Sequence, residues 1–483
     1  GLTFSPPILG NPSTSEKASM WQASTAGRTA SLSFIDTVGV ARLTSQQHMP
    51  QTGFARLYYD GVEMVNGVWR NPSFGKLGEP VSITIGESAS EDRGIVPGYG
   101  ALLRKPTDEE AGEAQYVIDA YERAGRFGIA AKIAYTHITR IAEGRYYPMV
   151  FGAPGDANHP GSPALFVDTV TSSGEWLVAG HEVAATTVTL WGPDVDGNLT
   201  SEVGLTVYHK ADPSGVVYAY VKASDFTTPT LTIDPEGEYF ASWTGGDALS
   251  GGAGDVIIAL LSASSLTIDY GAWEAVRQRL NVYLLAGFID DAVSPASVAL
   301  KTIGQHLPFG TRYGLNGLQP VLWPWLDDVD AKGSMTKLMV SDPDPDNGGR
   351  FTPHTSCFRS SDVSYTTDDA LTNATILYAF DVDSTTYTLD ASSLSTDSAY
   401  GVVGASRSGA SDKNSVRKTR WIWDPATAMA LSVLLARAHA IPRRRFRLDL
   451  WPEQYGPAGM FPMSAGVDVD ITSPGLYIDG LPA

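Results

Sequence analysis

Two serines stand in glycine-bearing segments of the kind that can present a nucleophile. They are Ser406, within 404–408, and Ser88, within 86–90. A hydrolase nucleophile elbow places glycine two residues before and two residues after the serine, so that the chain can turn sharply. In both segments the second glycine is replaced by serine. The sequence therefore favours plain loops here over a serine nucleophile.

A second candidate nucleophile is Cys357, which follows His354 by three residues. A base beside a cysteine lowers the pKa of the thiol and activates it. Thiol proteases, however, bring their cysteine and histidine together from distant parts of the chain. A free, buried cysteine is the common outcome, and we predict no thiol catalysis.

Metal-binding patterns are incomplete. Asp342, Asp344 and Asp346 resemble the start of a calcium loop, but the sixth and twelfth positions hold Asn347 and Pro353 instead of glycine and a carboxylate. The eight histidines are scattered, and His159 and His181 are interpreted as loop residues. We therefore expect no metal ion and no cofactor.

Paired carboxylates with tryptophan would suit a glycoside hydrolase, because one carboxyl protonates the leaving group while the other acts as nucleophile or base. The adjacent pairs 290–291 and 327–328 are expected by coincidence among 53 acidic residues. Indoles can stack on sugars, but Trp273, Trp421 and Trp423 stand in apolar contexts that favour core packing. The sequence names no catalytic residue.

The concentrated basic run is Arg443, Arg444 and Arg445, with Arg447 close behind. Polar and apolar residues alternate over 445–451, which predicts a strand with its arginines on one face. An ion-paired strand face or a subunit contact suits this run, since arginine is favoured at interfaces.

Composition sets wider limits. The chain has 483 residues and a formal net charge of −19, which argues against binding DNA by neutralising its phosphates. One cysteine excludes an intrachain disulfide and a four-cysteine zinc or iron–sulfur site. We see no secretory signal and no apolar run long enough to span a membrane. These features predict a protein that is made and folded in a cytosol.

Most of the chain has the pattern of β-structure, with turn residues recurring between short β-branched or alternating runs. Strands are expected at 53–61, 81–85, 186–191 and 205–208, and Asp60-Gly61 and Asp196-Gly197 are typical of tight turns. Helices are expected at 106–124, 271–286, 294–306 and 426–439. The last two begin at Ser294-Pro295 and Asp424-Pro425, where a capping residue precedes proline.

These elements must position any site, and they predict a mostly β protein with a few helices. We expect a first β domain at 1–95, an inserted α+β or β-rich domain at 96–268, and a helical connection with a second β domain at 269–483. Exposed loops are expected at 341–349 and 404–411, which are rich in small and polar residues.

The C-terminal third resembles the hub family of siphophage tail tips. The resemblance lies in a helix at 428–437, a proline at 442, an arginine-bearing strand at 446–450, and a final glycine-bounded strand within 460–472. Segments 145–152, 162–168 and 176–181 are similar to the inserted domain of these hubs. The single cysteine differs from hubs that carry an iron–sulfur cluster. The chain also ends shortly after its last motif, so we expect the spike and fibre to be separate chains.

The resemblance implies two tube-type β-barrel or sandwich domains per subunit and a homotrimeric ring with pseudo-sixfold symmetry. It implies a non-enzymatic virion protein at the tail tip or baseplate, assembled in the host cytoplasm. The expected partners are a distal tail or tail tube protein and a tip, fibre or spike protein, with the tape-measure protein as a further candidate. DNA would pass through the channel without specific binding. The alternatives are another phage tail protein, distal or receptor-binding, and a mostly β glycoside hydrolase or depolymerase.

Overall fold

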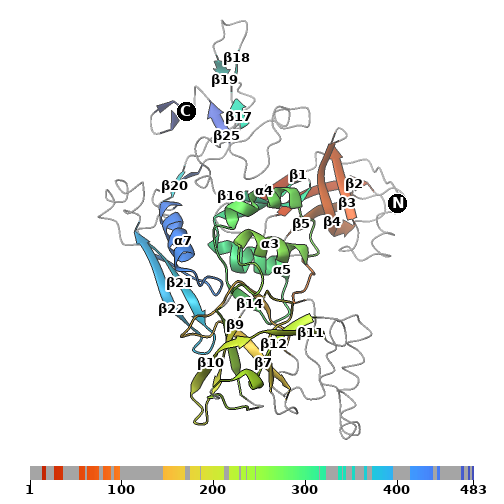
Figure 1. Ribbon diagram of the computed structural model, residues 1–483. Coiled ribbons are helices and arrows are strands. Elements are labelled where there is room, and N and C mark those ends of the chain that lie inside the picture. The colour runs from red at the N-terminus through yellow and green to blue at the C-terminus, as the bar shows by residue number, and fades with distance from the viewer. Residues whose placement is uncertain are drawn as a thin grey trace.

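The structure is a computed structural model of the chain (Figure 1). It describes residues 13–17, 27–35, 54–59, 62–74, 80–88, 92–97, 145–168, 174–184, 187–211, 217–227, 230–234, 237–244, 246–314, 316–322, 336–339, 341–343, 351–353, 364–366, 373–394, 414–438, 443–445, 469–472, 477–478 and 481–482. Strands predominate and a few helices interrupt them, as the sequence predicts. The predicted helix at 106–124 and loop at 404–411 lie outside the described residues.

The N-terminal region forms a five-stranded antiparallel sheet in the order β1-β2-β5-β4-β3. Its strands are β1 (Ser13–Lys17), β2 (Gly27–Ile35), β3 (Phe54–Tyr59), β4 (Val62–Phe74) and β5 (Pro80–Ser88). Alternation buries Ala30, Leu32 and Phe34 on one face of β2. On the other face Ser33 and Ser82 share a hydrogen bond of 2.7 Å between their hydroxyls. The strand predicted at 81–85 is confirmed, and the strand predicted at 53–61 is confirmed over its described residues, 54–59.

Seven strands that lie between residues 162 and 243 form an antiparallel sheet in the order β10-β9-β13-β7-β8-β12-β11. Its strands are β7 (Ser162–Asp168), β8 (Glu175–Ala179), β9 (Thr187–Pro193), β10 (Leu199–Thr206), β11 (Tyr208–Ala211), β12 (Val217–Lys222) and β13 (Tyr239–Trp243), with a short 3-10 helix, η4 (Ala223–Asp225), after β12. One core takes residues from six of the strands, so the sheet curls around it. We call this sheet with its core the inserted module.

The inserted module joins the rest of the molecule through paired strands. The chain enters it after β6 (Met149–Phe151), and β6 pairs antiparallel with β14 (Gly287–Ile289), which follows the module. Inside the module, Trp176 is fully buried and stacks on Phe166 with a centroid distance of 4.9 Å. Asp194 and Asn198 close the tight turn between β9 and β10, where the sequence predicts one.

A helical body lies above the inserted module in Figure 1. It contains α3 (Ala253–Ser262), α4 (Tyr270–Leu280), α5 (Pro295–Ser297), the π-helix η5 (Val298–Ile303), the 3-10 helix η6 (Gly304–His306), and the hairpin β15 (Phe309–Gly314) and β16 (Gly317–Leu322). Trp273 is fully buried at its centre and donates from Nε1 to the Leu318 carbonyl at 3.0 Å. The sequence predicts a domain boundary at residues 268–269. This boundary would separate α3 from α4, but both helices contribute residues to the same core.

One predicted helix is too long. The pattern at 271–286 predicts helix throughout, but α4 ends at Leu280. Beyond Asn281 the backbone is extended instead. The Ala253 N–H donates to the Tyr283 carbonyl, and the Leu285 N–H donates to the Gly251 carbonyl. Pairing with the start of α3 satisfies these groups better than a further helical turn exposed to water would.

The C-terminal unit is a three-stranded sheet covered by a helix. Strand β21 (Asn373–Asp381) lies between β22 (Thr386–Leu394), which is antiparallel to it, and β23 (Asn414–Lys418), which is parallel. Helix α7 (Pro425–Ala438) packs on the sheet and buries Leu431 and Leu435. The helices predicted at 294–306 and 426–439 are therefore confirmed within a residue or two at their ends.

Short strand pairs complete the described structure. They are β17 (Thr336–Met339) with β25 (Val469–Thr472), β18 (Ser341–Pro343) with β19 (Phe351–Pro353), β20 (Ser364–Thr366) with β24 (Arg443–Arg445), and β26 (Tyr477–Ile478) with β27 (Leu481–Pro482). The exposed loop predicted at 341–349 thus begins with a strand, because residues 341–343 pair with 351–353. Among the described residues, no helix has the length and hydrophobicity needed to cross a membrane.

Candidate functional site

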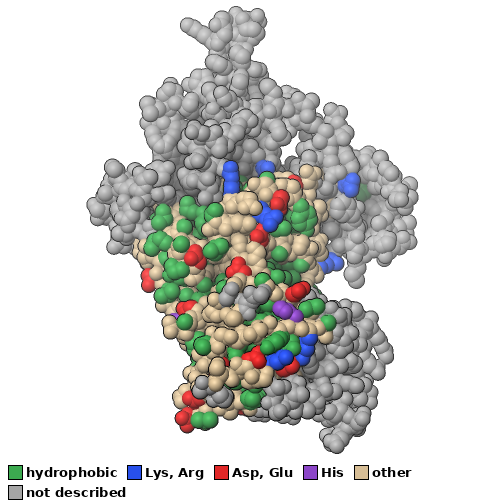
Figure 2. Space-filling model, viewed as in Figure 1, with side chains coloured by type: hydrophobic (Ala, Val, Ile, Leu, Met, Phe, Trp, Pro, Cys, Tyr) green, Lys and Arg blue, Asp and Glu red, His purple; other side chains and the backbone are tan. Residues whose placement is uncertain are grey.

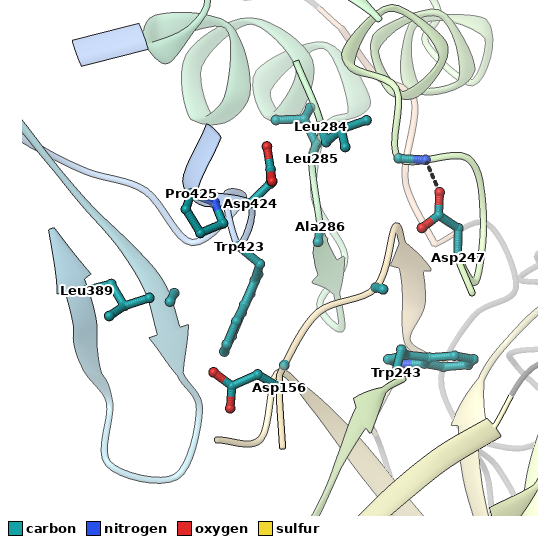
Figure 3. A pocket seen from close by; sticks show the side chains of 14 residues that line it. Asp156, Trp243, Asp247, Leu284, Leu285, Ala286, Leu389, Trp423, Asp424 and Pro425 are labelled. Atoms are coloured by element: carbon teal, nitrogen blue, oxygen red, sulfur yellow. Dashed lines mark hydrogen bonds between the residues drawn. The ribbon is translucent and has the colours of Figure 1, made fainter. Parts of the chain in front are cut away.

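A cavity of about 400 Å³ opens where the inserted module, the helical body and the C-terminal unit meet (Figure 3). We call it the α7 pocket, because α7 begins at its wall. Its lining residues are Ala153, Gly155, Asp156, Trp243, Asp247, Gly251, Leu284, Leu285, Ala286, Ala379, Leu389, Trp423, Asp424 and Pro425. They come from segments far apart in the sequence, so the fold alone brings them together.

Trp423 is the most prominent aromatic side chain of the α7 pocket. The two residues before it are fixed by backbone hydrogen bonds. The Trp421 carbonyl accepts from the Ala286 N–H, and the Ile422 carbonyl accepts from the Ala379 N–H, both at 2.9 Å. Trp423 itself is only half-buried, and Figure 3 shows its indole reaching toward Asp156. Core packing is confirmed for Trp273 and Trp421, whereas Trp423 has part of its surface free to contact a ligand.

Asp424 is held by the helix that it starts. Its Oδ2 accepts hydrogen bonds from the backbone N–H and the hydroxyl of Thr427, each at 2.7 Å. This is the N-cap arrangement, in which a carboxylate satisfies an unpaired N–H of the first turn. The other oxygen, Oδ1, has no hydrogen-bond partner in the part of the chain that the structure describes.

Asp156 organises a turn at the edge of the inserted module. Its Oδ1 accepts from the backbone N–H groups of Asn158 at 2.7 Å and His159 at 2.8 Å, and His159 Nδ1 lies 3.1 Å away. Ser242 anchors the turn by donating its hydroxyl to the His159 carbonyl at 2.9 Å. Gly155 must be glycine, because its φ is +94° and a Cβ atom would lie 2.7 Å from Ser242.

Asp247 is the least constrained of the three carboxylates. It is exposed, and its Oδ2 accepts one hydrogen bond, from Gly251 N–H at 3.2 Å. Figure 3 shows this bond on the opposite side of the cavity from Trp423. Asp247 Oδ1 has no partner among the described residues.

The lining of the α7 pocket is negative on balance. Its described lining residues include three aspartates and no lysine, arginine or histidine. Carboxylate oxygens accept hydrogen bonds, and the face of an indole attracts cations and planar groups. The pocket can therefore hold a group that donates hydrogen bonds and lies flat against an aromatic ring.

Most residues singled out from the sequence lie elsewhere. His181 does lie in a loop, but it is buried: Val150 N–H donates to its Nε2 at 3.1 Å, and its Nδ1 lies 3.0 Å from the Glu182 carbonyl. Ser88 ends strand β5, where the sequence favours a loop. Asp290 and Asp291 follow β14 and are exposed. Residues 327–328, 344–347, 354, 357, 404–408 and 447 lie outside the described residues.

The sequence analysis missed the three aspartates as a group. Only Asp424 carried a signal, because aspartate before proline predicts a helix start. Within the described residues no three of His, Cys, Asp and Glu are placed to hold a metal ion together. Comparison with models of protein families, with curated proteins and with solved structures gives no match.

Proposed function

We propose that the chain is a structural, non-enzymatic protein of a long-tailed bacteriophage virion, namely the hub of the tail tip. In this proposal three copies form a ring around a channel for DNA. One side of the ring binds the tail tube or distal tail protein, and the other side binds a tip, fibre or spike protein. The tape-measure protein is a further candidate partner.

The observation that carries the proposal is the order of the β units along the chain. A five-stranded sheet precedes the inserted module and a three-stranded sheet with α7 follows it. The module begins and ends beside the paired strands β6 and β14, as an insertion into a continuous body would. This order supports two tube-type domains, one near each end, with a β-rich domain between them.

Charge supports the same proposal. Each copy carries a formal net charge of −19, and a ring of three would place strong negative charge around its channel. Negative charge at the channel wall repels DNA phosphates and so favours sliding over binding. In the described part of the face shown in Figure 2, Asp and Glu side chains are scattered from the upper part to the lower end, and Lys and Arg side chains lie at the top, at the right and in the lower right.

The α7 pocket favours one alternative, a mostly β glycoside hydrolase, because it combines aspartates with an accessible indole. Two of these aspartates, however, organise local structure. Asp424 caps α7 and Asp156 organises the turn that includes His159. A binding role for the pocket therefore fits their hydrogen bonds better than acid–base catalysis.

The test is the mass and shape of the purified chain, measured by light scattering and negative-stain imaging, together with an assay for polysaccharide cleavage. We expect a trimer that forms a ring with a central hole and shows no cleavage. A stable monomer that cleaves polysaccharide would overturn the proposal in favour of the hydrolase.

A further inference from the structure

We infer that His181 and His209 form an acid-sensitive latch that holds the inserted module on strand β6. Each imidazole accepts a hydrogen bond from a backbone N–H group, which it can do only while the accepting nitrogen carries no proton. Acid would therefore open the latch and loosen the module at its junction with β6. We call the two imidazoles, together with residues 180–183, the histidine latch. Such a latch goes beyond the proposed function, and it holds whether or not the chain is a tail hub.

The first half of the histidine latch is the contact of His181 with β6. Strand β6 pairs with β14 along one edge. Along its other edge, the Gly180 N–H donates to the Pro148 carbonyl at 2.7 Å. The Val150 N–H on the same edge donates to Nε2 of His181 at 3.1 Å. The imidazole thus takes the place that a backbone carbonyl would occupy in a strand pair.

The second half of the histidine latch is the contact of His209 with the same segment. His209 lies on β11, which stands at one end of the order of the module's sheet (Figure 1). Its Nε2 accepts from the Val183 N–H at 3.1 Å. The sheet brings the two together, because His209 pairs with Ala219 of β12, and Ala219 pairs with Ala179, the residue just before the segment 180–183. The segment is therefore held on two sides by histidine acceptors.

Both contacts require neutral rings. A neutral imidazole has one nitrogen that accepts, whereas both nitrogens of an imidazolium ion are donors. Nδ1 of His181 lies 3.0 Å from the Glu182 carbonyl, so the proton of the neutral ring is on Nδ1 and Nε2 is the acceptor. A second proton would set Nε2 against the N–H of a buried residue, Val150 beside His181 or Val183 beside His209. Such an N–H group would lose its partner, which destabilises the closed latch.

The groups around His181 do not favour its protonation. Within the described structure neither ring of the latch bonds a carboxylate. Strand β6 has only apolar side chains, at 149–151, and the segment itself contributes Glu182, which is exposed to water. Burial is the main reason that the pKa of His181 lies below its usual value, and the nearby His209 acts in the same direction.

The sheet around His209 is apolar on the side of its ring. Strand β12 faces His209 with Ala219 and with a valine two residues to either side. The neighbours of His209 on β11 are Tyr208 and Lys210, which alternation directs to the opposite face. There Lys210 bonds the Glu175 carboxylate. A proton on His209 is therefore not offset by a negative side chain of these strands.

Opening of the histidine latch is linked to the uptake of protons. His209 is exposed and exchanges protons with water directly, whereas His181 is 8% exposed and becomes accessible once the segment 180–183 moves away. An open state that binds two more protons than the closed state gains up to about 100-fold in population per pH unit, where free rings are protonated and closed ones are not. Acid thus acts at the point where the chain enters the inserted module.

The test is hydrogen exchange followed by mass spectrometry on the full chain at pH 7.5 and pH 5.0. Each rate is corrected for the intrinsic effect of pH on exchange. After this correction, peptides that cover β6, the segment 180–183 and β11 should exchange at least about tenfold faster at pH 5.0, because two hydrogen bonds are lost. Peptides from β9 and β13, in the same sheet, should accelerate much less.

Glutamine variants keep the bonds and remove the titration. The amide oxygen of glutamine accepts an N–H group and binds no proton in this pH range. The double variant His181→Gln with His209→Gln should therefore exchange as the parent chain does at pH 7.5 and lose the acceleration at pH 5.0. His159→Gln is the matched control. The His159 ring lies 3.1 Å from the Asp156 carboxylate and is not part of the latch, so this variant should keep the acceleration.

Nitrogen NMR of the parent chain with labelled histidine takes the place of the double variant if circular dichroism shows that variant to be unfolded. The chain has eight histidines, and the single variants His181→Gln and His209→Gln assign the two signals. At pH 7.5 both rings should carry their proton on Nδ1 and none on Nε2. Both should become protonated over the pH range in which exchange of the segment 180–183 rises. A proton on Nε2 of either ring at pH 7.5 would overturn the latch.

Two exchange results would also overturn it. Equal acceleration at pH 5.0 in the parent chain and in the double variant would mean that another group responds to acid. Unchanged exchange of the segment 180–183 in the parent chain would mean that acid leaves the latch closed. Ring formation by the purified chain tests the tail-hub proposal separately, so the two can fail independently.

Discussion

His306 is the buried side chain whose ionisation should matter most for stability. It is 6% exposed, and its Nδ1 has no hydrogen-bond partner within the described structure. Burial, reinforced by the nearby charge of Arg417, lowers the pKa of His306 to about 4. The folded protein therefore resists protonation of this ring more strongly than the unfolded chain does.

The sign of the pH effect follows from that shift. The stability that neutral His306 contributes is fully present above the pKa of about 6.5 in the unfolded chain, and it is lost as the pH falls toward 4. Between pH 7 and pH 5 the His306 contribution should fall by about 2 kcal/mol. We expect His306→Gln to remove this part of the pH dependence, as measured by urea unfolding at both pH values.

Arg417→Gln provides the matched comparison for His306. It removes the smaller of the two causes of the pKa shift and leaves burial in place. This variant should therefore retain most of the pH dependence. Equal pH dependence in the parent chain and in His306→Gln would show that His306 does not titrate as its burial implies.

At the scale of elements, Thr427 connects α7 to the segment that follows α4. It is 3% exposed. Its hydroxyl donates to Asp424 at 2.7 Å and accepts from Leu284 N–H at 3.0 Å. Thr427→Val keeps the shape but removes both bonds, so it should weaken α7 and residues 281–286 together by about 1–2 kcal/mol.

Hydrogen exchange followed by mass spectrometry is the measurement for this element. Peptides from the start of α7 and from residues 281–286 should exchange about tenfold faster in Thr427→Val. Thr427→Ser, which keeps the hydroxyl, should exchange more slowly than the valine variant. Faster exchange in α7 alone would mean that the bond to Leu284 contributes nothing.

The helices also show what sequence patterns can and cannot predict. The sequence identifies Ser294 and Asp424 as helix caps, and each accepts the expected hydrogen bond, from the backbone N–H of Ser297 at 3.1 Å and of Thr427 at 2.7 Å. The sequence does not predict helix α3, because the start of this helix at Gly252 has no side-chain cap and its apolar run is also typical of a buried strand. Local chemistry identifies a capped helix, whereas an uncapped one depends on tertiary packing.

At the scale of the whole molecule, the α7 pocket lay beyond sequence reasoning. Asp156, Asp247 and Asp424 are separated by 91 residues or more, in three segments with no shared motif. Each is an ordinary turn, loop or cap aspartate in its own surroundings. Only the pairing of β6 with β14 and the packing of α7 on its sheet bring them to one cavity.

A substitution in either of the two largest hydrophobic cores should destabilise mainly the part of the molecule around that core, although the two parts meet at this cavity. Leu190 is fully buried inside the inserted module, and Leu260 is fully buried in the helical body. Replacing either residue by alanine should cost about 2–5 kcal/mol, because a cavity remains where the side chain was.

Hydrogen exchange can locate that loss. Leu190→Ala should speed exchange in β7–β13 and spare α3 and α4, while Leu260→Ala should do the reverse. Because β6 pairs with β14, exchange in these two strands should rise in both variants. Uniform acceleration throughout the chain by either variant would mean instead that the module and the body unfold as one cooperative unit. In that case the pocket between them would be a rigid feature, lost only on global unfolding.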